Sequence, residues 1–206
     1  MNNWQILTLG ILEDNKERLT FNMLKRMFQD IGYELHYINK TKNIAILKKI
    51  DKEILVVDIR PDMINPIGDL NINFDILIHN FIKLNSLNKE KIKKILKISK
   101  SIILNCDVDN WDCLIKDNKE SVVISYGFSN KAFINLSSYD IDSHIKANIC
   151  FQRGLKTIYG DIVDPFELTT VIESKKKDDI YSAMAILVFG ILTGHDILLE
   201  NDILSL

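Results

Sequence analysis

The chain has 206 residues, a length that fits one domain with a sizeable buried core. Hydrophobic residues make up 47% and charged residues 26%, the balance of an ordinary soluble globular protein, which excludes a fibrous or disordered chain. The formal net charge of -2 gives no global attraction to nucleic acid or to an anionic membrane, so we expect neither as a partner.

Cysteine usage and apolar runs favour a reduced, cytoplasmic setting. The three cysteines form no C-x-x-C pair and have no histidine at ligand spacing, so the sequence supports neither a disulfide framework nor a zinc site. The first residues lack the features of a signal peptide. The longest apolar stretch, 180–192, is shorter than the roughly 20 residues that span a bilayer, so we interpret it as a buried helix.

The first elements predict a buried strand followed by an amphipathic helix. The apolar run 5–11 is typical of a buried strand. Apolar residues then recur at helical spacing over 19–31. We expect Asp14 to cap this helix, with Glu17 three positions on, and Gly32 to end it.

The same alternation continues to residue 126. Further strands are predicted at 33–38, 54–59, 74–79, 101–105 and 121–126, with a lysine-rich amphipathic helix over 89–100 and a short helix at 109–114. A solvated helix face explains the lysines better than a binding patch does. Strands that alternate with helices at this spacing predict a mostly parallel sheet with right-handed crossovers.

The pattern changes after Gly127. Strand candidates at 132–136, 144–151, 156–159 and 166–172 predict a small antiparallel sheet, and a helix over 178–193 is apolar on most sides. The expected fold class is therefore α/β, with a mostly parallel sheet flanked by helices in a P-loop-like three-layer arrangement. A small antiparallel β subdomain is expected near residues 130–172, inside a single domain covering 1–206.

Three segments carry a family resemblance. They read I-L-N-C-D-V-D at 103–109, V-I-S-Y-G-F at 123–128 and D-I-Y-S-A-M-A at 179–185. In this order they are similar to V-L-N-A-D-D, V-x-T-Y-G and N-V-Y-N-A-L-A-A of the central, ATP-binding domain of the Mur ligases. These are the ATP-dependent amide-forming enzymes of peptidoglycan synthesis, related to the folylpolyglutamate synthetases. The resemblance implies a Mur ligase central-like domain over 1–206, with the family's N-terminal and C-terminal domains absent.

The loop after the first strand departs from the family's phosphate-binding motif. Such a loop points backbone N–H groups at the polyphosphate, while a lysine reaches the β- and γ-phosphates. The family reads G-x-T-G-T-N-G-K-T-T, and this chain reads G-I-L-E-D-N-K-E-R-L-T at 10–20. With Gly10 and Asn15 aligned, the replacements are Glu13 and Lys16 for two glycines, Glu17 for the lysine and Arg18 for the threonine that holds magnesium.

These replacements predict that ATP binding in the usual mode fails. Backbone freedom is reduced, a cation becomes an anion, and a metal ligand becomes a cation. The carboxylates of Glu13, Asp14 and Glu17 come to the positive end of the first helix, where each contributes about 0.3–1 kcal/mol. Lys16 and Arg18 can still offer charge to an anionic ligand, although exposed loop charge is the simpler interpretation.

Other family positions change in parallel. Asp58 stands where the resemblance implies a magnesium-holding Glu, or it is only a polar strand end. The T-N-x-x-x-D-H segment appears as H-N-F-I-K-L-N at 79–85, and we expect a hydrogen-bonded structural role for His79. Asp179 and Ser182 replace the two Asn residues that face the adenine in the family, where a preference of helix starts for such residues is the simpler account.

We therefore expect no catalytic residue, no metal and no cofactor, in a non-catalytic Mur-ligase-like protein that binds a protein partner, a second copy or a small anionic ligand. One alternative is the ATP-binding subunit of a split Mur-type amide ligase, in which ATP and magnesium would bind. Another is a nucleotide or nucleotide-sugar sensor, with a pocket at the carboxyl ends of the strands. The remnant pocket would consist of Gly10, Asn15, Asp58, Asn80 and Asp107.

Overall fold

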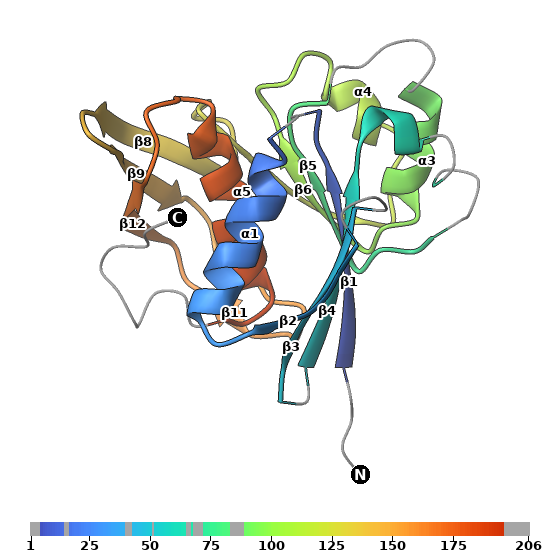
Figure 1. Ribbon diagram of the computed structural model, residues 1–206. Helices are drawn as coiled ribbons and strands as arrows, with labels where there is room; N and C mark the ends of the chain where they lie inside the picture. The colour runs from blue at the N-terminus through green and yellow to red at the C-terminus, as the bar shows by residue number, and fades with distance from the viewer. Residues whose placement is uncertain are drawn as a thin grey trace.

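The computed structural model describes residues 5–14, 17–39, 43–50, 52–64, 67, 72–82 and 89–195. Ten strands of this part of the chain form one sheet in the order β12-β9-β8-β7-β6-β5-β1-β4-β3-β2 (Figure 1). They are β1 (Gln5–Leu12), β2 (Glu34–Asn39), β3 (Ile44–Lys49), β4 (Lys52–Ile59), β5 (Ile76–His79), β6 (Ser101–Asn105), β7 (Val122–Gly127), β8 (Ile134–Ile141), β9 (Ile145–Phe151) and β12 (Phe166–Ile172). Two short strands, β10 (Leu155–Lys156) and β11 (Ile162–Val163), pair separately.

The middle of the sheet is parallel. β4, β1, β5, β6 and β7 run in one direction, and β8 continues parallel to β7. Every side chain of β5 and β6 is buried, as expected for strands whose two faces are both covered. This arrangement confirms the predicted α/β fold with a mostly parallel sheet.

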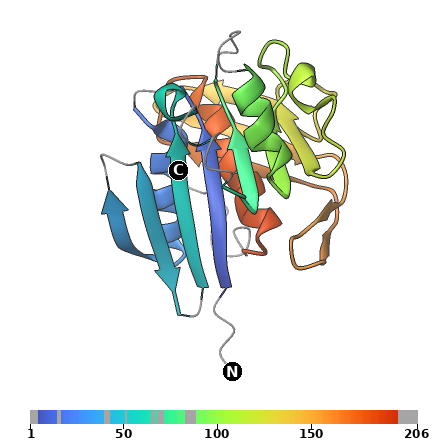
Figure 2. The same cartoon turned by 90° about the vertical axis from the view of Figure 1, so that its right-hand side faces the viewer.

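Antiparallel strands extend the sheet at both edges. β9 pairs antiparallel with β8 and β12, so the predicted antiparallel region near 130–172 is continuous with the main sheet. At the other edge, β2 and β3 form an antiparallel pair beside β4. β3 was not predicted, because a six-residue run ending in two lysines gives no clear period. Figure 2 shows β1 to β4 in one row, with α1 (Leu19–Asp30) behind them.

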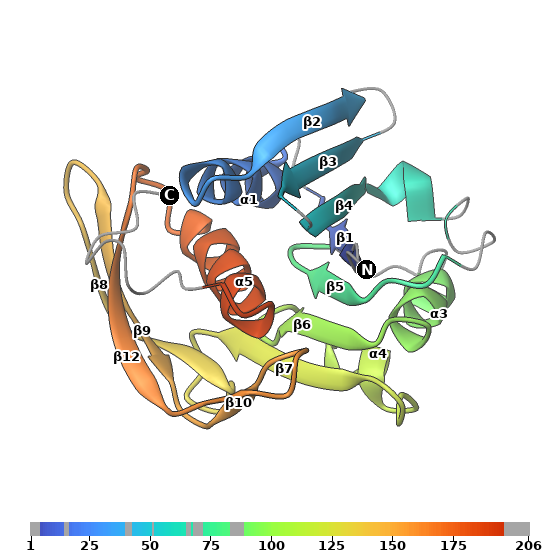
Figure 3. The same cartoon turned by 90° about the horizontal axis from the view of Figure 1, so that it is seen from below.

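Helices cover both faces of the sheet. α1 and α5 (Asp179–Leu192) contact each other on one face, and α3 (Lys89–Lys97) and α4 (Asp112–Ile115) lie together on the other (Figure 3). A short 3-10 helix, η1 (Pro61–Met63), follows β4. None of the helices in the described part of the chain has the length and apolar character needed to cross a bilayer.

The helix α5 is the centre of the larger core. All of its side chains except that of Tyr181 are buried. Figure 3 shows the reason, because α5 lies between α1, the central strands and the curved strands β8, β9 and β12. A helix that is enclosed on all sides can be apolar around its whole circumference. This agrees with the apolar character predicted for most sides of the helix from its sequence. Its first turn lies at the carboxyl edge of the sheet.

Candidate functional site at the carboxyl edge of the sheet

Polar side chains gather where the central parallel strands end. Glu13 follows β1, Asp58 lies next to last in β4, Asn80 follows β5 and Asn105 ends β6. Glu13, Asp58 and Asn80 are 0% exposed and Asn105 is 1% exposed. Buried polar groups are almost always hydrogen-bonded. The contacts of these side chains therefore define what the edge can bind.

The carboxyl group of Glu13 caps α1. Its Oε2 accepts the backbone N–H of Thr20 at 3.1 Å, and its Oε1 accepts the N–H of Phe21 at 3.3 Å. The prediction that Asp14 caps this helix is wrong, because α1 begins directly after Arg18. The side chain of Arg18 makes no capping hydrogen bond. Free N–H groups at a helix N-terminus are the donors that hold an anion, and here a side chain of the same chain occupies them.

Burial changes the acidity of this carboxyl group. The pKa of Glu13 is raised to about 7, chiefly by loss of hydration on burial and to a smaller extent by the nearby Asp58 carboxylate, while hydrogen bonds from Thr20 and Phe21 oppose the rise. Whether it is protonated or ionised, Glu13 fills the space in front of the first turn of α1.

Arg18 and Asp58 form a buried ion pair. Arg18 Nε lies 2.6 Å from Asp58 Oδ2, and the two side chains are 16% and 0% exposed. The guanidinium also lies 4.2 Å from the ring centroid of Phe21. The prediction of exposed loop charge is therefore wrong for Arg18. The resemblance assigned both residues to a magnesium site, and in this chain an internal cation contacts the carboxylate.

Backbone geometry indicates that the Arg18 position is demanding. Arg18 has φ 52° and ψ 48°, the left-handed region that residues other than glycine adopt at a cost. By contrast, Glu17 remains near the surface, where its carboxylate meets Lys176 Nζ at 3.0 Å. The loop thus turns one cation inward and keeps an acidic side chain outside.

A buried hydrogen-bond network joins the strand ends to both helices. Asn80 Nδ2 donates to Thr20 Oγ1 at 3.1 Å and to Ser182 Oγ at 3.2 Å. These two hydroxyl groups lie 3.0 Å apart, and Asn105 Nδ2 donates to Asn80 Oδ1 at 3.1 Å. Ser182 is thus part of this network, rather than only a residue favoured at a helix start. The network ties α1, α5, β5 and β6 together through side chains of the chain itself.

Asp107 connects this network to the surface. Its backbone N–H donates to Asn105 Oδ1 at 3.0 Å, and its Oδ2 accepts the N–H of Phe128 at 2.5 Å and the hydroxyl of Tyr181 at 3.0 Å. Burial and the Asp107 carboxylate both raise the pKa of Tyr181. A Cβ on Gly127 would lie 2.7 Å from Asp107 Oδ2, so the absence of a side chain there admits the carboxylate.

The structure brings three of the five predicted pocket residues to one edge. Asp58, Asn80 and Asp107 lie there, each engaged by groups of the chain itself. Asn15 is outside the described residues. Gly10 lies inside β1, where a Cβ would be 2.5 Å from Leu77 Cδ1, so close packing against β5 explains this glycine.

Sequence reasoning missed one residue of the site and misjudged another. The carboxylate of Glu13 was expected at the positive end of the first helix, and the hydrogen bonds that it accepts from the N–H groups of Thr20 and Phe21 confirm this. Thr20 was not considered, although it lies at the start of the same helix. His79 was expected to be hydrogen-bonded, but neither ring nitrogen has a partner among the described residues. Complete burial lowers the pKa of His79 to about 4, so the ring is neutral. The described residues contain no cluster of three or more His, Cys, Asp or Glu that would suit a metal ion.

The fold is similar to two solved structures from Acinetobacter baumannii. One is MurF, with a TM-score of 0.66 and 8% identity over 92% of this chain and 43% of that one. The other is UDP-N-acetylmuramoylalanyl-D-glutamyl-2,6-diaminopimelate--D-alanyl-D-alanyl ligase, with a TM-score of 0.68 and 8% identity over 94% of this chain and 44% of that one. This chain thus spans less than half the length of either protein.

Comparisons of the sequence alone give no further relationship. No protein-family model matches the chain, and no curated protein matches it. At 8% identity, the structural likeness shows a Mur ligase-like fold and nothing about activity.

Proposed function

We propose that this chain is a non-catalytic protein with a Mur ligase-like fold, in which its own side chains take the places of phosphate and magnesium. The observation that supports the proposal most directly is the Glu13 carboxyl group, which accepts the N–H groups of Thr20 and Phe21. In proteins with a phosphate-binding loop, N–H groups at this end of a helix hold the polyphosphate.

Binding of a triphosphate would require the displacement of Glu13. The displaced carboxyl group would lose both N–H donors while it remained close to the Asp58 carboxylate. A buried polar group left without its partners costs about 1–3 kcal/mol, and a charged group costs more. A triphosphate would also bring further negative charge to this edge.

Arg18 disfavours binding of a magnesium ion at Asp58, as Glu13 disfavours binding of a triphosphate. A magnesium ion at Asp58 would have to displace the guanidinium that now lies 2.6 Å from the carboxylate. Two like charges cannot share this buried position at low cost. Glu13 and Arg18 therefore act against the two halves of a Mg-ATP complex.

Without this chemistry, the fold would act by binding. A protein partner or a second copy of the chain is our first candidate. The edge strand β2 has no neighbouring strand on its outer side within the described residues, and none of its six residues is buried. Such edges accept an added strand from another chain. A small anionic ligand remains a further candidate.

Isothermal titration calorimetry with Mg-ATP and with UDP-linked sugars tests the proposal. We expect no saturable heat from the wild-type protein with Mg-ATP. A variant carrying Glu13→Gly and Arg18→Thr empties both positions and should bind Mg-ATP more tightly than wild type. Glu17→Gln, which removes an exposed carboxylate from the same loop, is the matched control. Micromolar binding of Mg-ATP by the wild-type protein, with turnover, would contradict the proposal, and binding of UDP-linked sugars alone would favour the sensor instead.

A further inference from the structure

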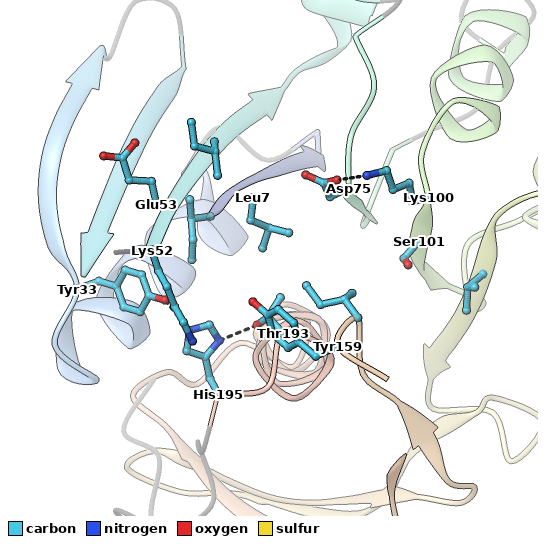
Figure 4. A pocket seen from close by; sticks show the side chains of 14 residues that line it. Leu7, Tyr33, Lys52, Glu53, Asp75, Lys100, Ser101, Tyr159, Thr193 and His195 are labelled. Atoms are coloured by element: carbon cyan, nitrogen blue, oxygen red, sulfur yellow. Dashed lines mark hydrogen bonds and ion pairs between the residues drawn. The ribbon is translucent and has the colours of Figure 1, made fainter. Parts of the chain in front are cut away.

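A cavity of about 430 Å³ opens at the amino-terminal edge of the sheet, the edge opposite Glu13 (Figure 4). The first residues of β1, β4, β6 and β7 line it, together with the loop between β10 and β11 and the residues that follow α5. Its apolar lining consists of Ile6, Leu7, Ile54, Val122, Ile158 and the ring of Tyr159. The volume is in the range of small-molecule sites, about 300–1,000 Å³.

Large apolar side chains at this cavity are unusually exposed. Ile6 is 62% exposed, Val122 60%, Tyr159 46% and Ile158 38%. Apolar surface in contact with water costs free energy, and gathered apolar groups of this kind mark binding sites more often than scattered ones do. An apolar ligand in the cavity would remove this surface from water.

The loop that forms one wall is held in place by α5. The N–H of Ile158 donates to the carbonyl of Leu192 at 2.9 Å, and the N–H of Tyr159 donates to Thr157 Oγ1 at 3.3 Å. The Tyr159 ring packs over Gly194, where a Cβ would lie 3.2 Å from the ring. A wall that is already ordered lowers the entropy cost of binding.

Among the described residues that line the cavity, Lys52 lacks a carboxylate partner, and its Nζ lies 5.9 Å from the centroid of the Tyr159 ring. Asp75 pairs with Lys100 at 2.7 Å, and Glu53 pairs with Lys48 at 3.1 Å, so both acidic residues of the lining are neutralised. The ammonium group of Lys52 therefore favours an anion inside the cavity.

His195 adds polarity to the lining without adding charge. Its Nε2 lies 2.7 Å from the hydroxyl of Tyr33, and its Nδ1 lies 2.7 Å from Thr193 Oγ1 (Figure 4). Burial, together with the positive charges of Lys52 and Lys49, lowers the pKa of this ring to about 4. The imidazole is neutral at pH 7, and Lys52 remains the source of positive charge.

We propose that this cavity binds a small organic carboxylate, whose apolar body packs against Tyr159 and Val122 while its carboxylate pairs with Lys52. A doubly charged phosphate would bring a second negative charge out of water with no cation to pair it, which costs free energy, so a singly charged carboxylate fits a site with one ammonium group better. A cation of the same shape would be repelled. The inference goes beyond the proposed function and does not depend on Glu13 or Arg18, which lie at the other edge of the sheet.

Titration with 2-naphthoate and its neutral amide, 2-naphthamide, tests the proposal by ¹H–¹⁵N NMR spectroscopy on the full chain. We expect 2-naphthoate to shift the backbone amides of Lys52, Val122, Tyr159 and His195 in a saturable way. The amide should bind about tenfold more weakly, as expected for loss of one partly screened charge pair. Shifts centred elsewhere, or equal affinity for the acid and the amide, would overturn the proposal.

Two variants separate the charged contact from the apolar one. Lys52→Gln should weaken binding of 2-naphthoate about tenfold and leave binding of 2-naphthamide unchanged. Tyr159→Ala should weaken both compounds, because it removes part of the apolar wall. Lys146→Gln, at an exposed lysine of β9, is the matched control and should bind like wild type. Equal loss in Lys146→Gln and Lys52→Gln would show non-specific attraction and contradict the assignment.

Discussion

Arg18 Nε lies 2.6 Å from Asp58 Oδ2, and the Asp58 side chain is completely buried. The two residues are 40 positions apart in the chain, and the family resemblance had assigned both positions to a magnesium site. The carboxylate therefore meets a guanidinium of its own chain. The stability of the protein should depend on this contact.

Removal of the Arg18 guanidinium should destabilise the protein strongly. Arg18→Ala removes a guanidinium that contacts the buried Asp58 carboxylate, and breaking a buried ion pair by removing one partner typically costs about 3–5 kcal/mol. Urea denaturation measures the free energy of unfolding. The double variant with Asp58→Ala should lose less than the sum of the two single losses, because no charge is then stranded.

The matched control is the exposed pair of Arg26 and Glu173, with nitrogen and oxygen 2.7 Å apart. Arg26→Ala should change the free energy of unfolding by less than about 1 kcal/mol. If Arg18→Ala and Arg26→Ala lowered the free energy of unfolding equally, the ion pair with Asp58 would contribute no more to stability than an exposed pair.

Glu13 should make the stability of the protein depend on pH. The pKa of Glu13 is about 7 in the folded chain, against an ordinary value of 4.5. Between these values the folded chain holds a proton that the unfolded chain has released, so the free energy of unfolding falls as pH rises from about 4.5 to about 7. The fall is on the order of 3 kcal/mol.

Glu13→Gln should abolish this fall, because an amide does not titrate and its oxygen can still accept an N–H group. Urea denaturation at a series of pH values compares the slopes. Glu17→Gln, at a carboxylate that is 65% exposed, should keep the wild-type slope. An unchanged slope in Glu13→Gln would show that another group titrates in this window.

Asn80 should be the most sensitive member of the buried network. Asn80→Ala removes a donor to Thr20 and Ser182 and the acceptor of Asn105 Nδ2. Stranded buried polar groups should lower the free energy of unfolding by about 2–3 kcal/mol. Asn22, which is exposed on α1, makes one hydrogen bond to the carbonyl of Glu17, and Asn22→Ala should cost less than about 1 kcal/mol. A similar cost for the two variants in thermal or urea unfolding would argue against the network.

Gly10 should be required for packing of β1 against β5. Gly10→Ala places a Cβ 2.5 Å from Leu77 Cδ1 and 3.1 Å from the ring of Phe74. Overpacking of this kind costs about 1–3 kcal/mol, and adding Leu77→Val should recover part of the loss. Gly154→Ala, where the nearest atom would be 3.6 Å away, is the control and should be nearly neutral. Failure of Leu77→Val to restore any stability in urea unfolding would place the cause elsewhere.

Much of the fold follows from local pattern. The strand over 101–105, the strand over 166–172 and the helix over 179–192 were predicted within one residue at each end, because their apolar periods and flanking turn residues are strong. β3 was missed because its six-residue run ends in two lysines and has no clear period, although the strand lies between β4 and β2. The departure of the loop at 10–20 from the phosphate-binding motif was also evident in the sequence, because such a motif is defined by residue types at consecutive positions.

The sequence by itself determined the α/β class and which residues stand in the loop after the first strand. Only the tertiary structure decided what those residues contact. Arg18 reaches Asp58, and Asn80 reaches Ser182 across 102 positions, because the strand order places β1 between β4 and β5 and packs α5 beside α1. Such pairings depend on which segments become neighbours when the chain buries its apolar faces. The local sequence pattern does not specify which distant segments these are.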